Sequence, residues 1–336
     1  MSQVLKNSED FFEKITDLLK NARKKAVYSI NQTMVYTYFE IGKIIIEEEQ
    51  KGQKRAEYGK QIIKELSQKL IKEFGKGFSQ RNLEQMRQFY LAYSNTQALS
   101  AEFRLSWSHY VFLTRIDNEN ERKFYEIEAI ESNWSLRELQ RQFDSALFER
   151  LVLSRDKKDV KKLSEKGQII KNPQDTLKDP YILEFLGLPE ETRYSETDLE
   201  QKLIDKLENF LLALGKGYTF VGRQVRFTFD DKHFRIDLVF YNRLLQSFVL
   251  IDLKIGELTH QDLGQMQMYV NYYDRYVKLG HENKTVGMVL CKKKNDILIE
   301  ITLAENNEQI FASKYQTVLP SKKELKQLIE DKLTDE

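Results

Sequence analysis

Cysteine and long apolar runs are scarce in this sequence of 336 residues. A single cysteine, Cys291, excludes an intrachain disulfide and a cysteine-rich metal cage. No apolar run approaches the ~20 residues that a membrane-spanning helix needs. The stretch from Met1 to Lys25 is charged throughout and has no signal-peptide apolar region. We therefore expect a protein of the reducing cytoplasm that spans no membrane.

An excess of charge of one sign is also missing, since 53 Lys and Arg residues stand against 52 Asp and Glu residues. The formal net charge of +1 gives no indication of a globally basic nucleic-acid binder. The charge is nevertheless uneven, because residues 51–100 hold ten basic and four acidic residues. The segment Gly75-Lys76-Gly77 lacks the G-x-x-x-x-G-K-[ST] spacing of a phosphate-binding loop, so we expect no ATP hydrolysis.

Proline is rare and clustered, and this divides the chain. The first 172 residues have no proline, which favours helices, whereas three of the four prolines lie at 173, 180 and 189. We predict a helical domain over 1–155, a connector over 156–190 and a second domain over 191–336. Within the first domain, Ser79 and Ser135 are expected to begin helices, and the helix after Ser135 is expected to bury Leu136, Leu139, Phe143 and Leu147.

After residue 190 the apolar pattern changes from helical to alternating. We expect helices over 196–214, 260–278 and 321–333, and strands over 224–229, 234–241, 248–254, 285–291 and 309–314, with 296–304 left open. This order of elements is typical of an α/β domain with a mixed sheet. In the strand over 234–241, alternation places Phe234, Ile236, Leu238 and Phe240 on the face opposite Asp237.

Two aspartates are expected to meet across a hairpin. The midpoint of Asp237 and Asp252 lies at the centre of the turn Arg243-Leu244-Leu245-Gln246, so simple antiparallel pairing places these aspartates opposite each other. The same pairing places Arg235 opposite Lys254. Two carboxylates at that distance repel each other unless one is protonated or a cation lies between them.

Two interpretations of this pair are open. In the first, Lys254 forms a half-buried salt bridge with Asp252 or Asp237 and has a structural role. In the second, the carboxylates hold a divalent cation such as Mg²⁺, which prefers oxygen ligands and activates water for attack on a phosphodiester. Lys254 would then orient the water or stabilise the developing charge.

The pattern Asp237 with Asp252-Leu253-Lys254 resembles the core of the PD-(D/E)xK phosphodiesterase superfamily, which has the restriction-endonuclease-like fold. Gln265 and Tyr269 resemble its additional Q-x-x-x-Y motif. Over residues 20–318 the chain is similar to the YhcG-type nucleases, as in Phe74-Gly75-Lys76-Gly77-Phe78-Ser79, Val221-Gly222-Arg223-Gln224 and Gly264-Gln265-Met266. It departs from the superfamily pattern in having Ile236 in place of proline and Asp252 in place of the commoner glutamate.

This resemblance implies a Mg²⁺-dependent DNA endonuclease for which Mn²⁺ would substitute. Asp237, Asp252 and the Leu253 carbonyl would hold the metal, and Lys254 would position the attacking water. Gln265 would orient Lys254 or a phosphate. The first helix of the fold would add a carboxylate, for which we favour Glu200 over the alternatives Glu196 and Glu208.

Several arginines are candidates for contacts with nucleic acid. The helices over 57–74 and 79–93 could form a helix-turn-helix variant whose second helix presents Arg81 and Arg87 outward, although a solvated helical hairpin has the same pattern. Arg223, Arg226 and Arg235 are expected near the aspartates. DNA is the expected partner, RNA stays open, and a homodimer is open as well.

Two rival functions remain. A nuclease fold without activity could bind nucleic acid or assemble with a partner, and it would need no divalent metal. A helical interaction module could instead regulate a partner, with the second domain as its scaffold; its function would then not depend on Asp237.

Overall fold

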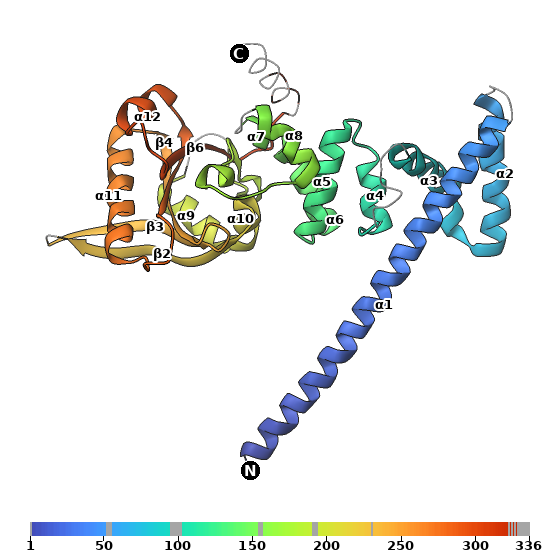
Figure 1. Cartoon of the computed structure of the whole chain (residues 1–336), viewed down its shortest axis with the longest axis horizontal. Coiled ribbons are helices and arrows are strands. Elements are labelled where there is room, and N and C mark those ends of the chain that lie inside the picture. Colours follow the sequence, from blue (N-terminus) through green and yellow to red (C-terminus); the bar gives the residue numbers. More distant parts are fainter. Residues whose placement is uncertain are drawn as a thin grey trace. The chain divides into compact units, whose positions relative to one another are not determined.

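A computed structural model describes residues 2–51, 56–94, 103–153, 157–189, 194–229 and 231–321, together with 323, 325 and 327. The chain divides into two compact units, Met1–Leu139 and Gln140–Glu336. The predicted N-terminal helices and the predicted mixed C-terminal sheet are both present (Figure 1).

Helices form the first unit, as the lack of proline predicts. The predicted helix start at Ser79 is confirmed, because the Ser79 hydroxyl accepts a hydrogen bond from the backbone N–H of Asn82 at 3.3 Å. The elements are α1 (Ser2–Lys51), α2 (Ala56–Phe74), η1 (Lys76–Phe78), α3 (Gln80–Tyr93), α4 (Trp107–Leu113), α5 (Glu119–Glu131) and the start of α6 (Leu136–Asp144).

The C-terminal half of α1 packs closely on α3. A Cβ atom at Gly42 would overlap the backbone carbonyl of Met86, so only glycine allows this approach. Beside it, the rings of Phe39 and Phe89 meet edge to face with centroids 5.6 Å apart. The N-terminal half of α1 extends away from α2 and α3, and its described side chains over residues 11–31 are all exposed (Figure 1).

The second unit begins with short elements. They are α7 (Leu147–Leu153), α8 (Lys157–Lys166), η3 (Pro173–Thr176), β1 (Tyr181–Ile182), η4 (Glu184–Leu186), α9 (Glu196–Asp205) and α10 (Leu207–Leu214). The prediction that one helix carries both Leu136 and Leu147 is wrong. The helix that begins after Ser135 ends at Asp144, and Ala146 has a φ of 51°, which no helix accommodates.

The predicted helix over 196–214 is also divided. It breaks at Lys206, whose φ and ψ of −117° and 33° lie outside the helical range, so α9 and α10 are separate helices.

A mixed six-stranded sheet forms the centre of the second unit. The strand order is β1-β6-β5-β4-β3-β2, with β1, β6, β5 and β4 parallel to their neighbours and β2-β3-β4 antiparallel. β1 pairs with β6 at one edge, and β2 forms the other edge. The strands after β1 are β2 (Tyr218–Phe229), β3 (Lys232–Asn242), β4 (Ser247–Glu257), β5 (Val286–Lys293) and β6 (Ile310–Gln316).

A hydrophobic core covers each face of this sheet. One core packs under α9 and α10, and the other under α11 (His260–Tyr276), whose predicted cap, Thr259, is confirmed by its capping box with Asp262. The open segment 296–304 forms α12 (Asp296–Thr302). The predicted helix over 321–333 lies almost wholly outside the described residues. None of the described helices is both long and apolar enough to cross a membrane.

One predicted alternation is wrong. Phe234 and Ile236 pack in the core under α11 together with Val239, whereas Leu238 and Phe240 pack in the core under α9 and α10. The strand therefore changes its side-chain phase next to Asp237. This change lies at the place where the structure concentrates its polar buried side chains.

Candidate active site

Asp237 and Asp252 lie together on adjacent antiparallel strands. The pairs Leu238 with Ile251 and Val239 with Leu250 confirm the register that the midpoint argument predicts. The paired ladder ends one residue before the aspartates, so the two strands part where the carboxylates lie. The side chain of Asp237 replaces the missing backbone acceptor, because its Oδ2 accepts a hydrogen bond from Leu253 N–H at 2.9 Å.

The environment of Asp252 disfavours its charged form. The residue is only 3% exposed. Burial and, next, the charge of Asp237 raise the pKa of Asp252 to about 7, against the opposing effect of Lys254. The hydrogen bond between the two carboxyl groups acts in the same direction. The pair therefore behaves as two carboxylates that cannot both be ionised without a cation nearby.

Lys254 supplies part of that positive charge. Its Nζ lies 3.0 Å from Asp252 Oδ2, so the salt bridge of the structural interpretation is present. Asp262 and Glu196 lie farther away, at 3.8 and 3.9 Å from the same Nζ. Burial alone would lower the pKa of Lys254, but the carboxylates outweigh it, Asp252 first, and raise that pKa. The lysine therefore stays protonated.

Glu200 joins the site through Gln224, a residue that the sequence interpretation missed. The Gln224 side-chain amide donates to Glu200 Oε2 and, at 3.0 Å, to Asp237 Oδ1. Gln224 has a φ of 46°, in the left-handed region that non-glycine residues seldom adopt. Such strain is typical of functional positions.

A signal for Gln224 existed in the sequence. The pairs Arg223 with Leu238 and Val225 with Ile236 place Gln224 opposite Asp237, and the midpoint of these two positions falls at the turn between β2 and β3. The arithmetic that paired Asp237 with Asp252 would have found it.

The three candidate glutamates of the first helix differ in position. Glu200 is 8% exposed, and burial raises its pKa, with the hydrogen bond from Gln224 opposing. Glu196 is exposed but lies beside Lys254. Glu208 lies on α10 and is exposed. The geometry therefore favours Glu200 among the three.

Gln265 lies on α11, one helical turn before Tyr269. Its side-chain amide donates to the Tyr269 hydroxyl, which donates in turn to the backbone carbonyl of Arg235 at 2.8 Å. The pKa of Tyr269 is raised mainly by burial, and the charges of Asp252 and Asp237 contribute, which locates this hydroxyl near the carboxylates. Gln265 is thus tied to the wall of the site, and its hydrogen bond goes to Tyr269.

The predicted arginines lie in different surroundings. Arg223 donates to Gln201 at 2.8 Å. Arg226 and Arg235 are both exposed and form a directly opposed cross-strand pair between β2 and β3. Directly opposed like charges are destabilising, so this pair suits an anion.

On α3 of the first unit, Arg81 is exposed as predicted. The prediction that Arg87 faces outward is wrong. Its guanidinium binds both carboxylate oxygens of Glu49 on α1, at 2.8 and 3.0 Å, because α3 packs against α1 along that side.

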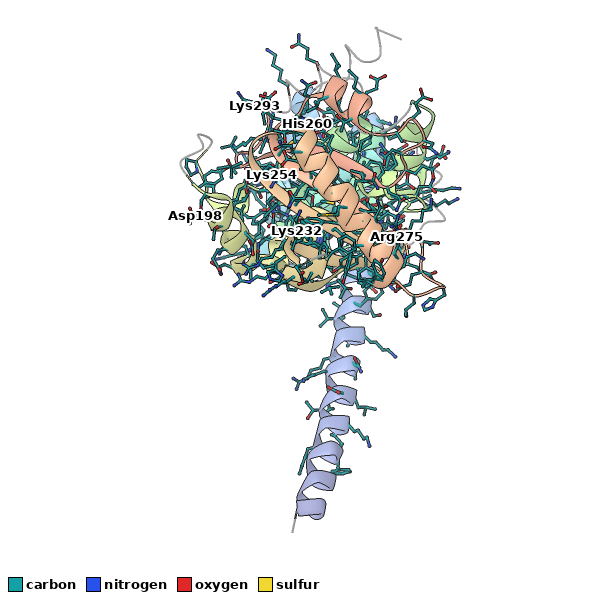
Figure 2. The ribbon with its side chains drawn as sticks, turned by 90° about the vertical axis from the view of Figure 1, so that its left-hand side faces the viewer. Asp198, Lys232, Lys254, His260, Arg275 and Lys293 are labelled. Carbon is teal, nitrogen blue, oxygen red and sulfur yellow. The ribbon has the colours of Figure 1, made fainter. Side chains whose placement is uncertain are left out.

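A cavity of about 460 Å³ opens at the carboxyl ends of β4, β5 and β6. It begins at Ile255, the residue after Lys254, and its basic lining consists of Lys292, Lys293 and Lys314. The remaining lysine of the sequence run, Lys294, is bound to Asp179 at 2.6 Å. Figure 2 shows Lys254 and Lys293 on the α11 side of the unit.

The residues present fit a small divalent cation. Asp252 Oδ2 is buried and accepts no hydrogen bond, although Lys254 is near, and the adjacent Asp237 carboxylate adds negative charge. Across the described ranges, no three His, Cys, Asp or Glu side chains form a closed metal cage. Mg²⁺ is typically bound through one or two carboxylates, with water and phosphate completing its shell, so an aspartate pair suits it.

Two solved structures also match part of the chain. They are the "crystal structure of a repair endonuclease from Pyrococcus abyssi" (TM-score 0.25, 12% identity, 40% of this chain and 50% of that chain) and the "Structure of EndoMS-dsDNA2 complex" (TM-score 0.26, 14% identity, 40% and 51%). The match spans about half the length of these structures.

The family comparison covers both units. Residues 174–331 match the YhcG PDDEXK nuclease domain, and residues 14–150 match the DUF1016 N-terminal domain. A protein of Escherichia coli (strain K12) described as "Putative nuclease YhcG" is 39% identical over 341 residues, which cover 93% of this chain and 90% of that protein. The chain therefore belongs to the YhcG family of PDDEXK nucleases, with a helical DUF1016 N-terminal domain before a restriction-endonuclease-like domain.

Proposed function

We propose that this chain is a Mg²⁺-dependent phosphodiesterase that cleaves DNA. The observation that carries the proposal is the pair of adjacent carboxylates, Asp237 and buried Asp252, with Lys254 Nζ 3.0 Å from Asp252. A structural salt bridge needs one carboxylate, whereas this site brings two together and raises the pKa of one of them.

The residues have separate roles in this proposal. Asp237, Asp252 and the Leu253 carbonyl hold the metal, for which Mn²⁺ substitutes. Bound there, the metal supplies charge neutralisation at the phosphate and acidifies a water molecule. Lys254 carries a positive charge at the same edge and orients the attacking water. Glu200 completes the acidic set.

Gln224 and Gln265 are positioning residues. Gln224 holds Glu200 and Asp237 together through one amide group while neither is neutralised by a cation. Gln265 fixes Tyr269, and the Tyr269 hydroxyl fixes the backbone of β3 two residues before Asp237. The predicted contact of Gln265 with Lys254 or a phosphate stays a prediction.

The proposed substrate contacts are basic side chains around this site. Arg226 and Arg235 face each other across the β2–β3 hairpin, Arg223 lies beside Gln224, and Arg81 is exposed on α3. Arg87 stays a weaker candidate because Glu49 already binds it. We propose a DNA substrate with RNA as the alternative, no use of ATP and a cytoplasmic location.

Cleavage by purified variants tests the assignment. Asp252→Ala and Lys254→Ala are expected to lose Mg²⁺-dependent cleavage of DNA, whereas Glu208→Ala, on an exposed surface of α10, is expected to cleave normally. Full cleavage by both site variants would show that the site is wrongly assigned.

Calorimetry separates the nuclease from the rival binding protein. The wild-type chain is expected to bind Mn²⁺, and Asp252→Ala is expected not to bind it. Tight DNA binding without any metal binding would support a nuclease fold that has lost its activity.

A further inference from the structure

The N-terminal half of α1 presents an apolar surface that the first unit does not cover. Leu18 is 70% exposed and Phe12 is 66% exposed, although both are large apolar side chains. All described side chains over residues 11–31 are exposed. Helices in proteins gain most of their stability from packing of an amphipathic face, so a helix with this surface needs a partner.

The apolar side chains form one stripe. At about 100° per residue, the stripe residues fall within an arc of roughly 120°, which contains no charged residue. They are Phe11, Phe12, Ile15, Leu18, Leu19, Ala22, Ala26 and Ile30. The face that packs on α3, through Val35, Phe39 and Gly42, lies roughly 150° away around the helix. The stripe is therefore a separate surface and no continuation of the core.

The stripe is self-complementary when two copies run in opposite directions. Centred between Leu18 and Leu19, antiparallel pairing places Phe11 opposite Ala26 and Ile15 opposite Ala22. A large side chain thus meets a small one at each level, which is the arrangement that fills a helix interface without voids. A parallel pair would place alanine against alanine and leave gaps at two levels.

The charge order along the segment favours the same direction. Residues 9–17 hold four acidic residues and one basic residue, whereas residues 18–25 hold four basic residues and none that is acidic. Antiparallel copies bring the acidic part of one helix beside the basic part of the other, whereas parallel copies align like charges. A two-fold axis relates the two copies in such a pair.

The buried area is sufficient for a stable contact. Burial of one Leu, Ile or Phe side chain removes about 60–120 Å² from water. The six large residues of the stripe on each of two copies then remove roughly 700–1,400 Å², a range that includes the ~1,000 Å² expected of a biological interface.

We propose that residues 11–30 of α1 pair antiparallel with the same residues of a second copy, making the protein a homodimer. This proposal is independent of the proposed nuclease activity. Its dimer would carry two copies of the candidate site.

The mass of the full-length chain in solution tests this. Analytical ultracentrifugation is expected to give twice the 39.9 kDa chain mass for the wild type. Leu18→Glu combined with Leu19→Glu is expected to give a monomer, with its folding checked by circular dichroism. Val27→Glu is the matched control, since Val27 is 58% exposed on the same helix but lies outside the stripe, and it should stay dimeric. A monomeric wild-type chain, including one that binds anionic vesicles through this helix, would overturn the proposal.

Cross-linking tests the direction. Ile15→Cys combined with Ala22→Cys is expected to give a covalent dimer on a non-reducing gel, whereas Ile15→Cys alone is expected to give none. The two cysteines of one chain are about 10 Å apart along the helix, too far for a bond within the chain. A covalent dimer from Ile15→Cys alone would indicate parallel helices and contradict the antiparallel arrangement.

Discussion

At the scale of single residues, Asp252 has a consequence for stability as well as for chemistry. Its pKa of about 7 in the folded chain lies above its ordinary 3.8, so the folded state holds this proton more tightly than the unfolded state. The stability gained from that proton is full below pH 4 and is lost as the pH rises toward 7.

We expect Asp252→Asn to raise the unfolding temperature of the metal-free protein at pH 8, because the variant removes a disfavoured charge. The gain should shrink at pH 4. Thermal unfolding in the presence of a chelator measures both values, and a lower unfolding temperature at pH 8 would contradict the assigned pKa direction.

Gln224 permits a second prediction at this scale. Gln224→Ala removes the amide that joins Glu200 and Asp237, so two carboxylates lose a shared donor. We expect a loss of about 1–3 kcal/mol in the free energy of unfolding of the metal-free chain at pH 8, and less at pH 4. Gln201→Ala, an exposed residue on α9, is the control for chemical denaturation and should change little.

At the scale of elements, the α1–α3 contact depends on a missing side chain. Gly42→Ala forces the two helices apart, because its Cβ would overlap the Met86 carbonyl. We expect a clear fall in the unfolding temperature of the first unit. Gly264→Ala is a matched helical control, since a Cβ there meets nothing within 4 Å, and alanine at that position should be neutral or stabilising.

The β2–β3 hairpin gives a prediction about binding. Arg226→Ala relieves a like-charge pair with Arg235, so the free energy of unfolding should stay equal or rise while DNA affinity falls. The dependence of log affinity on log salt should become shallower by about one unit per lost phosphate contact. Fluorescence anisotropy at several salt concentrations measures this slope, with Arg275→Ala in the last turn of α11 as control.

At the scale of the whole molecule, the order of elements and the aspartate pair followed from the sequence because each rests on local arithmetic. Strand alternation and the turn midpoint placed Asp237 next to Asp252. The same arithmetic failed between Ile236 and Leu238, where the strand changes phase beside the left-handed Gln224. It also failed for Arg87, because the approach of α1 to α3 depends on tertiary packing that helical periodicity does not contain.

The two-residue strand β1 has a consequence for how this chain can be divided. Tyr181 and Ile182 cover the free edge of β6, and the preceding Asp179 is bound to Lys294. A fragment that starts at residue 191 would leave β6 with unpaired backbone groups, which recruit other strands. Such a fragment should aggregate, whereas one that starts at residue 140 should remain in solution, as light scattering can show. The few residues before α9 therefore act as a guard against misassembly of the sheet.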